Sequence, residues 1–264
     1  MDDIVFIGLG VSRKPSLKKG NSFAYMNTFF LHELLMLGPA IGSIIVMKIF
    51  GTGSFPKWKW GKFKHYLMIA VANLAFWMIP VFLNSFITGN GFKLNSSIDQ
   101  YQWIVIICHL TIAWIGGIGE ELGWSVWLLS RLANQMGRTR AVMISGVLRG
   151  IWHLPIVMGS VFWRLNNGKI SMSIFLLSLI QYCILLPATG ILLSSIWGYV
   201  WYKTQSIPLI GWTHQSYDAV RDIAVIVVVN FGNYGILYNL YGLAVMLAAS
   251  VLFLILMKRE EKLT

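Results

Sequence analysis

Long apolar stretches, separated by short polar connections, dominate this chain and limit its fold more than any other feature. A helix that crosses a bilayer needs about 20 apolar residues, and about seven stretches of the sequence meet that requirement. They are residues 25–50, 66–88, 103–130, 139–162, 171–201, 206–229 and 234–257. We therefore predict an all-α polytopic membrane helical bundle of about seven spans, within a range of roughly six to eight.

The composition agrees with a membrane protein. Hydrophobic residues make up 56% of the chain and charged residues only 12%, whereas about a quarter of a soluble domain is charged. The formal net charge of +11 does not indicate nucleic-acid binding here, because Lys and Arg collect between apolar stretches, beside lipid headgroups. Cys108 and Cys183 lie inside apolar stretches without metal or disulfide spacing, so we expect them to be packing residues. We predict one integral-membrane domain over residues 1–264, with the lipid bilayer and not nucleic acid as a partner.

The distribution of basic residues predicts an orientation in the membrane. The connection after the first stretch reads KWKWGKFKH, the one after the third contains Arg131, Arg138 and Arg140, and the sequence ends in MKREEKLT. Because positively charged loops remain in the cytoplasm, we predict that these segments, including the C-terminus, are cytoplasmic.

A further basic group conflicts with this orientation. The segment RKPSLKKG, residues 13–20, precedes the first stretch and would lie on the opposite side of the membrane. Two explanations stay open at this point. The first stretch bends back at GPAIG as a re-entrant pair, or the short N-terminal segment is translocated.

Five ionisable residues lie at similar depth inside the apolar stretches, where a charge is costly and usually marks a pathway or a site. They are Glu120 and Glu121 in the third stretch, His153 in the fourth, and His214 and Asp218 in the sixth. At about 1.5 Å per residue, all lie roughly 12–21 Å from the cytoplasmic end of their helices. Because lipid does not solvate them, we expect these helix faces to turn inward and meet.

Helical spacing supports this convergence. His214 and Asp218 are separated by one turn and share a helix face, which Arg221 and Asp222 continue. Arg149 stands one turn before the histidine of the fourth stretch. Three readings are possible: a polar core that fixes helix packing, a proton or ion pathway, and a hydrolytic or metal site. The combination of residue types from three spans favours the hydrolytic or metal site.

Other polar residues are weaker candidates. The segment HELLM, which begins with His32 and Glu33, starts like a zinc-protease helix but has no second histidine, so we expect these two residues to be interfacial. His109 precedes Glu120 by three turns and is within reach of the same cavity, although we expect it to serve packing.

These motifs resemble the CPBP family of intramembrane proteases, which comprises CAAX proteases and bacteriocin-processing enzymes and is also called the ABI family. Its pattern has Glu-Glu-x-x-x-Arg on one helix, Phe-x-x-x-His on the next, and His-x-x-x-Asn/Asp on a later one. Here the motifs read EELGWS from Glu120, RGIWHLP around His153, and THQSYDAV with His214 and Asp218. The resemblance covers about residues 100–220.

The sequence departs from the family pattern at two positions. Trp124 matches bacterial members, but Ser125 stands where the first motif has arginine, and Arg149 stands where the second motif has an aromatic residue. We interpret this as an exchange in which Arg149 supplies the missing positive charge to Glu121 from the neighbouring helix. A buried pair of carboxylates needs such a partner.

The resemblance implies hydrolysis of a peptide bond within or beside the membrane. Glu120 would then be the general base that takes a proton from water, and His153 would hold or help to activate that water. Glu121 would orient the assembly through a cation, with Arg149 and Trp124 in support. His214 and Asp218 would face the developing oxyanion.

The role of metal stays open in the sequence. Glu120, His153, His214 and Asp218 would make an acceptable zinc shell, and the family has been described both as metalloproteases and as metal-free glutamate proteases. We favour the metal-free mechanism slightly, because aspartate, as in Asp218, also occurs at the last position of the third motif in the family pattern. An ionised Asp218 cannot donate a hydrogen bond to an oxyanion, which leaves it as an acceptor, a protonated group or a ligand.

The resemblance also implies a membrane-associated or lipidated peptide as substrate and a bacterial plasma membrane as the location. Two other functions remain: an inactive family member that acts as a bacteriocin-immunity or scaffold protein, and a proton or ion pathway.

Overall fold

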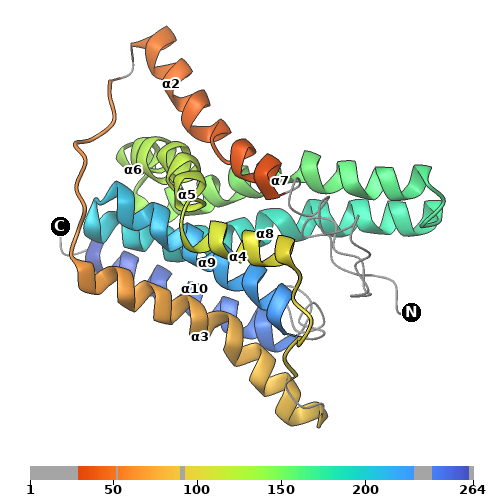
Figure 1. Cartoon of the computed structure of the whole chain (residues 1–264). Helices are drawn as coiled ribbons and strands as arrows, with labels where there is room; N and C mark the ends of the chain where they lie inside the picture. Colours follow the sequence, from red (N-terminus) through yellow and green to blue (C-terminus); the bar gives the residue numbers. More distant parts are fainter. Residues whose placement is uncertain (1–28, 52, 90–92, 229–239, 262–264) are drawn as a thin grey trace.

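The computed structural model of the chain describes residues 29–51, 53–89, 93–228 and 240–261 (Figure 1). A first helix over residues 29–35 is followed by ten named elements. These are α2 (Gly38–Phe50), α3 (Phe63–Thr88), α4 (Gln100–Leu110), α5 (Trp114–Glu121), the π-helix η1 (Leu122–Leu129), α6 (Ser130–Met136), α7 (Arg138–Asn166), α8 (Met172–Thr204), α9 (Ile207–Val227) and α10 (Leu240–Glu261). Among the described residues the β-structure is limited to one isolated bridge, between Leu94 and Val228, so the predicted all-α fold class is confirmed.

Within the described part of the chain, four helices are long and apolar enough to cross a membrane, and the bent pair of α4 with α5–α6 raises the number to five. Each of the seven predicted stretches corresponds to one helix or to this pair, although residues 25–28, 229 and 234–239 of those stretches lie outside the described part of the chain. The remaining two helices are α9, which contains the ionisable stripe, and α10, whose charged residues stand only at its end, in KREE. A bundle of about seven spans is compatible with this arrangement, and the chain is an integral membrane protein.

The first stretch does not bend back at GPAIG. Residues 29–50 form one span, with a turn at Met36–Leu37 that keeps helical hydrogen bonds, including Met36 N to His32 O at 3.0 Å and Ile41 N to Leu37 O at 3.0 Å. The proline of this motif lies in the first turn of α2, where its missing N–H costs no helical hydrogen bond. The re-entrant explanation is therefore wrong, and the basic residues 13–20 lie outside the described part of the chain.

The third stretch, predicted as one helix over 103–130, is broken instead. Between α4 and α5 the axis bends by 49°, and the carbonyl oxygen of Cys108 accepts from the amides of both Ile112 and Ala113 at 3.0 Å. After α5 the helix widens into the π-helix η1 before it continues as α6. Such π-helical turns are rare and often accompany functional sites, and here the turn follows the two glutamates directly.

Helix α9 forms the centre of the bundle. Most of its residues are buried, and it packs against α3, α4, α5, η1 and α8. Its start is fixed by Ser206, whose hydroxyl accepts from the Leu209 amide at 3.3 Å and donates to the Lys59 carbonyl at 2.7 Å. This cap sets the register of the ionisable stripe that follows.

Helices α7 and α8 lie side by side, and their connected end projects beyond the other helices (Figure 1). Their close approach depends on glycines: a Cβ added to Gly190 would lie 2.1 Å from the Gly146 carbonyl oxygen, and one added to Gly150 would lie 2.3 Å from the Leu186 carbonyl oxygen. Small residues of this kind are typical of helix pairs in membranes, where van der Waals contact replaces the hydrophobic effect.

Gly190→Val is expected to separate α7 from α8 and to lower the free energy of unfolding by about 1–3 kcal/mol, the usual cost of overpacking. Thermal unfolding in detergent measures this effect. Gly159→Val is the matched control on α7, because an added Cβ there meets nothing within 4 Å. Equal unfolding temperatures for the two variants would show that the glycine contact is not what holds the pair together.

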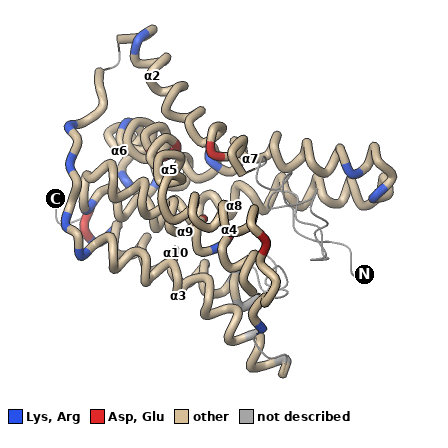
Figure 2. Tube along the Cα trace, in the orientation of Figure 1, with Lys and Arg blue, Asp and Glu red and all other residues tan. Residues whose placement is uncertain are grey.

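Basic residues gather at one end of the bundle, around the segment between α2 and α3, the α6–α7 turn and the end of α10 (Figure 2). The three segments that carry these basic residues are far apart in the sequence and meet at this end of the bundle. A smaller basic group, Arg164 and Lys169, lies at the projecting end of α7 and α8.

Candidate active site

The two glutamates end helix α5, which lies directly against α9. The helices approach closely at Gly117 and Gly211: a Cβ added to Gly117 would lie 2.6 Å from the Gly211 carbonyl oxygen. This contact brings Glu120 and Glu121 beside His214, one turn further along α9. The predicted convergence of the third and sixth stretches is therefore present in the structure.

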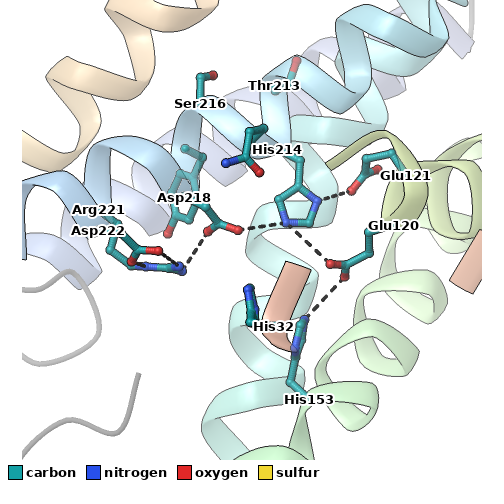
Figure 3. Close-up of polar contacts among 12 residues, drawn as sticks. His32, Glu120, Glu121, His153, Thr213, His214, Ser216, Asp218, Arg221 and Asp222 are labelled. Carbon is teal, nitrogen blue, oxygen red and sulfur yellow. Dashed lines mark hydrogen bonds and ion pairs between the residues drawn. The ribbon is translucent and has the colours of Figure 1, made fainter. Parts of the chain in front are cut away.

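Glu120 lies between two histidines from different helices (Figure 3). Its Oε1 is 3.6 Å from Nε2 of His153 on α7, and its Oε2 is 3.8 Å from Nε2 of His214. The indole N–H of Trp124 donates to Oε1 at 3.1 Å. The carboxylate is 1% exposed, whereas the His153 side chain is 35% exposed. The cluster is thus buried at Glu120 and accessible at His153.

Glu121 is fully engaged by other side chains. Arg149 binds it with both terminal nitrogens, Nη1 to Oε1 at 2.5 Å and Nη2 to Oε2 at 3.1 Å. The Ser125 hydroxyl donates to Oε2, and Nδ1 of His214 lies 2.8 Å from Oε1. The predicted pairing of Arg149 with Glu121 is present, and Ser125 contacts the same carboxylate from the position where the family motif has arginine.

Trp197 on α8 also contacts this cluster of side chains. Its ring stacks on the His214 ring at 4.4 Å between centroids and 25° between planes. The Arg149 guanidinium carbon lies 4.5 Å from the Trp197 ring centroid, a cation–π distance. Sequence reasoning did not single out Trp197, because twelve tryptophans occur in the chain and nothing in the local sequence distinguishes this one.

Asp218 continues the network along α9. Its Oδ2 lies 3.3 Å from Nε2 of His214, and its Oδ1 accepts from Nη1 of Arg221 at 2.7 Å. Arg221 also pairs with Asp222 through Nε at 2.6 Å and Nη2 at 3.0 Å. All five predicted site residues and the supporting Arg149 and Trp124 are therefore brought together.

Two of the weaker candidates also lie close to this cluster. Figure 3 draws His32 next to the cluster, and its side chain is only 16% exposed, so it is largely covered by other parts of the protein. His109 is buried on α4, with Nε2 3.2 Å from Asp222 Oδ2 and Nδ1 3.2 Å from the Gln215 amide nitrogen. Each is a single histidine without a spaced partner in its own helix, so the local sequence gives little signal for either.

The four residues that could bind zinc do not form a common metal shell in this arrangement. Within the described ranges, no group of three or more His, Cys, Asp or Glu side chains is arranged to hold a metal ion. Both nitrogens of His214 face carboxylates, and the carboxylate of Asp218 is shared between His214 and Arg221. Because His214 and Asp218 are already paired with other charged groups, the four residues as placed do not fit a tetrahedral zinc site.

Comparison with known families agrees with the motifs. The family model described as Type II CAAX prenyl endopeptidase Rce1-like matches residues 101–220. Residues 101–220 are therefore similar to the Rce1-like family. This family is one of CAAX-type proteases, and the match includes every residue of the cluster from Glu120 to Asp218.

The Rce1-like match confirms the family inferred from the three motifs. It ends before Arg221 and Asp222, and it excludes the first helix with His32 as well as α3 and α10. No curated protein matches the chain. The comparison therefore supports peptidase activity at the level of the family. The residues outside 101–220 are described from the structure of this chain alone.

Proposed function

We propose that the protein is an intramembrane endopeptidase that hydrolyses a peptide bond in membrane-associated, lipidated peptides. The observation that carries this proposal is the position of the Glu120 carboxylate, which faces His153 at 3.6 Å and His214 at 3.8 Å. These separations exceed a direct hydrogen bond, so the three groups can bind one water molecule in common.

In this mechanism Glu120 is the general base. It takes a proton from the water, and the resulting hydroxide attacks the carbonyl carbon of the scissile peptide. The carbon–oxygen bond forms as the carbonyl becomes an oxyanion. The proton then passes from Glu120 to the leaving nitrogen as the carbon–nitrogen bond breaks. His153, the more exposed partner, lies where it can hold the water and meet the substrate.

Glu121 has a different role from Glu120. Its oxygens are taken by Arg149, Ser125 and His214, which leaves it no capacity to accept a proton from water without losing an ion pair. It therefore fixes His214 from the Nδ1 side.

His214 can carry a positive charge beside Glu120. Nδ1 faces Glu121 at 2.8 Å and Nε2 faces Asp218 at 3.3 Å, so both ring nitrogens have carboxylate acceptors. An imidazolium can donate to both, whereas a neutral imidazole can donate to one. A positive ring beside Glu120 would stabilise the negative charge that develops during attack. Asp218 is an acceptor that orients this ring and does not itself contact the oxyanion.

The substrate class follows from the family and the fold. The site lies on helices that cross the membrane, so a peptide anchored by a lipid would reach it from the bilayer or from the cytoplasmic surface. The basic end of the bundle in Figure 2 supports a cytoplasmic C-terminus. We place the protein in a bacterial plasma membrane, on family resemblance. The two other functions predict different results: a scaffold or immunity protein would not cleave peptides, and an ion pathway would conduct.

The proposal predicts that activity is independent of metal. Purified protein in detergent is expected to cleave members of a library of membrane-anchored, prenylated peptides. Addition of 1,10-phenanthroline is expected to leave the rate unchanged, because His214 and Asp218 are paired with other charged groups. Metal analysis of the same sample should find substoichiometric zinc. Inhibition that added Zn²⁺ reverses would instead make Glu120, His153, His214 and Asp218 a ligand set.

A further inference from the structure

The carboxylate of Asp218 is held from two sides. His214 lies on its Oδ2 side at 3.3 Å, and Arg221, one turn further along α9, donates to Oδ1 at 2.7 Å. The contacts of the Arg221 guanidinium are with Asp218 and Asp222, and Arg221 lies on the far side of Asp218 from Glu120, Glu121 and His153 (Figure 3). It therefore acts on the catalytic cluster only through Asp218.

Arg221 is itself held in a fixed orientation. Asp222 binds Nε at 2.6 Å and Nη2 at 3.0 Å, a two-point contact along one edge of the planar guanidinium. Asp222 in turn lies 3.2 Å from Nε2 of His109 on α4. Two nitrogens of Arg221 thus contact Asp222, and the third, Nη1, is directed at Asp218.

The contact of Arg221 with Asp218 meets an electrostatic requirement of this site. The carboxylates of Glu120, Glu121 and Asp218 all lie within 3.8 Å of His214. Arg149 and a positively charged His214 balance two of these three carboxylates, so a third cation is required if all three are to stay ionised. Lysine cannot reproduce this geometry, because its ammonium is a point charge without a planar fork.

We propose that Arg221, held by Asp222 and His109, is a positioning residue that keeps Asp218 oriented toward His214 during peptide hydrolysis. The inference rests on the proposed endopeptidase function. It extends the functional unit to His109 on α4, and to Arg221 and Asp222 on α9, which follow the last residue of the matched family region.

The test compares Arg221→Met with wild type in cleavage of a fluorogenic prenylated CAAX peptide. A positioning role predicts that kcat falls about 30-fold while KM changes by less than about threefold, since substrate binding is untouched. Arg221→Lys should recover part of kcat, because it keeps the charge and loses the fork. Arg140→Met, at an exposed arginine of α7, is the matched control and should retain the wild-type kcat.

A double-mutant cycle separates positioning from a general packing role. In an Asp218→Asn background the amide needs no counter-charge, so Arg221→Met should cost less than about threefold there. Unchanged kcat in Arg221→Met, or losses that multiply in the double variant, would overturn the inference. If Arg221→Met does not fold, Arg221→Lys decides: wild-type kcat in that variant overturns the inference. If wild type itself does not cleave the peptide, the proposed function fails and the inference fails with it.

Discussion

Glu120→Gln is expected to lower kcat by about a thousandfold, which is within the range that general-base catalysis contributes. Glutamine keeps the size of the side chain and can still accept from Trp124, but it cannot take a proton from water. The buried position of Glu120 between His153 and His214 leaves no other carboxylate free to replace it, because Glu121 is paired with Arg149. Initial rates on a prenylated peptide, at equal amounts of folded protein, measure the loss.

The matched control for this variant is Glu260→Gln. Glu260 lies near the end of α10 and pairs with Lys203 at 2.5 Å, well separated in sequence and function from the cluster. Its replacement should leave kcat at the wild-type value. Glu120→Gln protein that retains more than a tenth of the wild-type rate would remove Glu120 from the role of base.

Arg149→Met is expected to destabilise the folded protein by about 3–5 kcal/mol, since it leaves the fully buried Glu121 carboxylate without its cation. The effect should appear as a lower unfolding temperature in detergent and as poor recovery of folded protein. Adding Glu121→Gln should restore most of the lost stability, because the pair would then be removed as a whole. Equal stability of wild type and Arg149→Met would show that the ion pair is not what supports this part of the site.

A second test of the ion pair with Glu121 moves the positive charge from position 149 to position 125. Ser125 and Arg149 both bind Oε2 of Glu121, one from the same helical segment and one from α7. Ser125→Arg combined with Arg149→Phe should therefore place the guanidinium near the same oxygen and restore stability relative to Arg149→Phe alone. If the double variant is inactive while Ser125→Arg alone is active, the two positions are not interchangeable.

Much of the site could be predicted from residue type and depth. Charged groups inside apolar stretches have few acceptable environments, so Glu120, His153 and His214 from three spans were expected to meet, and they do. The one-turn spacing of His214 and Asp218 likewise predicted a shared face. These inferences succeed because helix geometry and the cost of burying charge act locally and strongly.

Other features depend on tertiary packing and leave little signal in the sequence. The π-helix after Glu121 and the bend after Leu110 interrupt a stretch whose hydropathy is continuous. Trp197 reaches His214 through the contact of α8 with α9. His109 meets Asp222 through the contact of α4 with α9, which hydropathy does not reveal.

Isotope labelling tests the central claim most directly. Purified wild-type protein is incubated with a prenylated CAAX peptide in H₂¹⁸O, and the products are weighed by mass spectrometry. Hydrolysis by the Glu120 cluster predicts two shorter peptides, with one ¹⁸O atom in the newly formed carboxylate. Recovery of the intact peptide from protein shown to be folded, across prenylated and unmodified substrates, would contradict the assignment of peptidase activity to this chain.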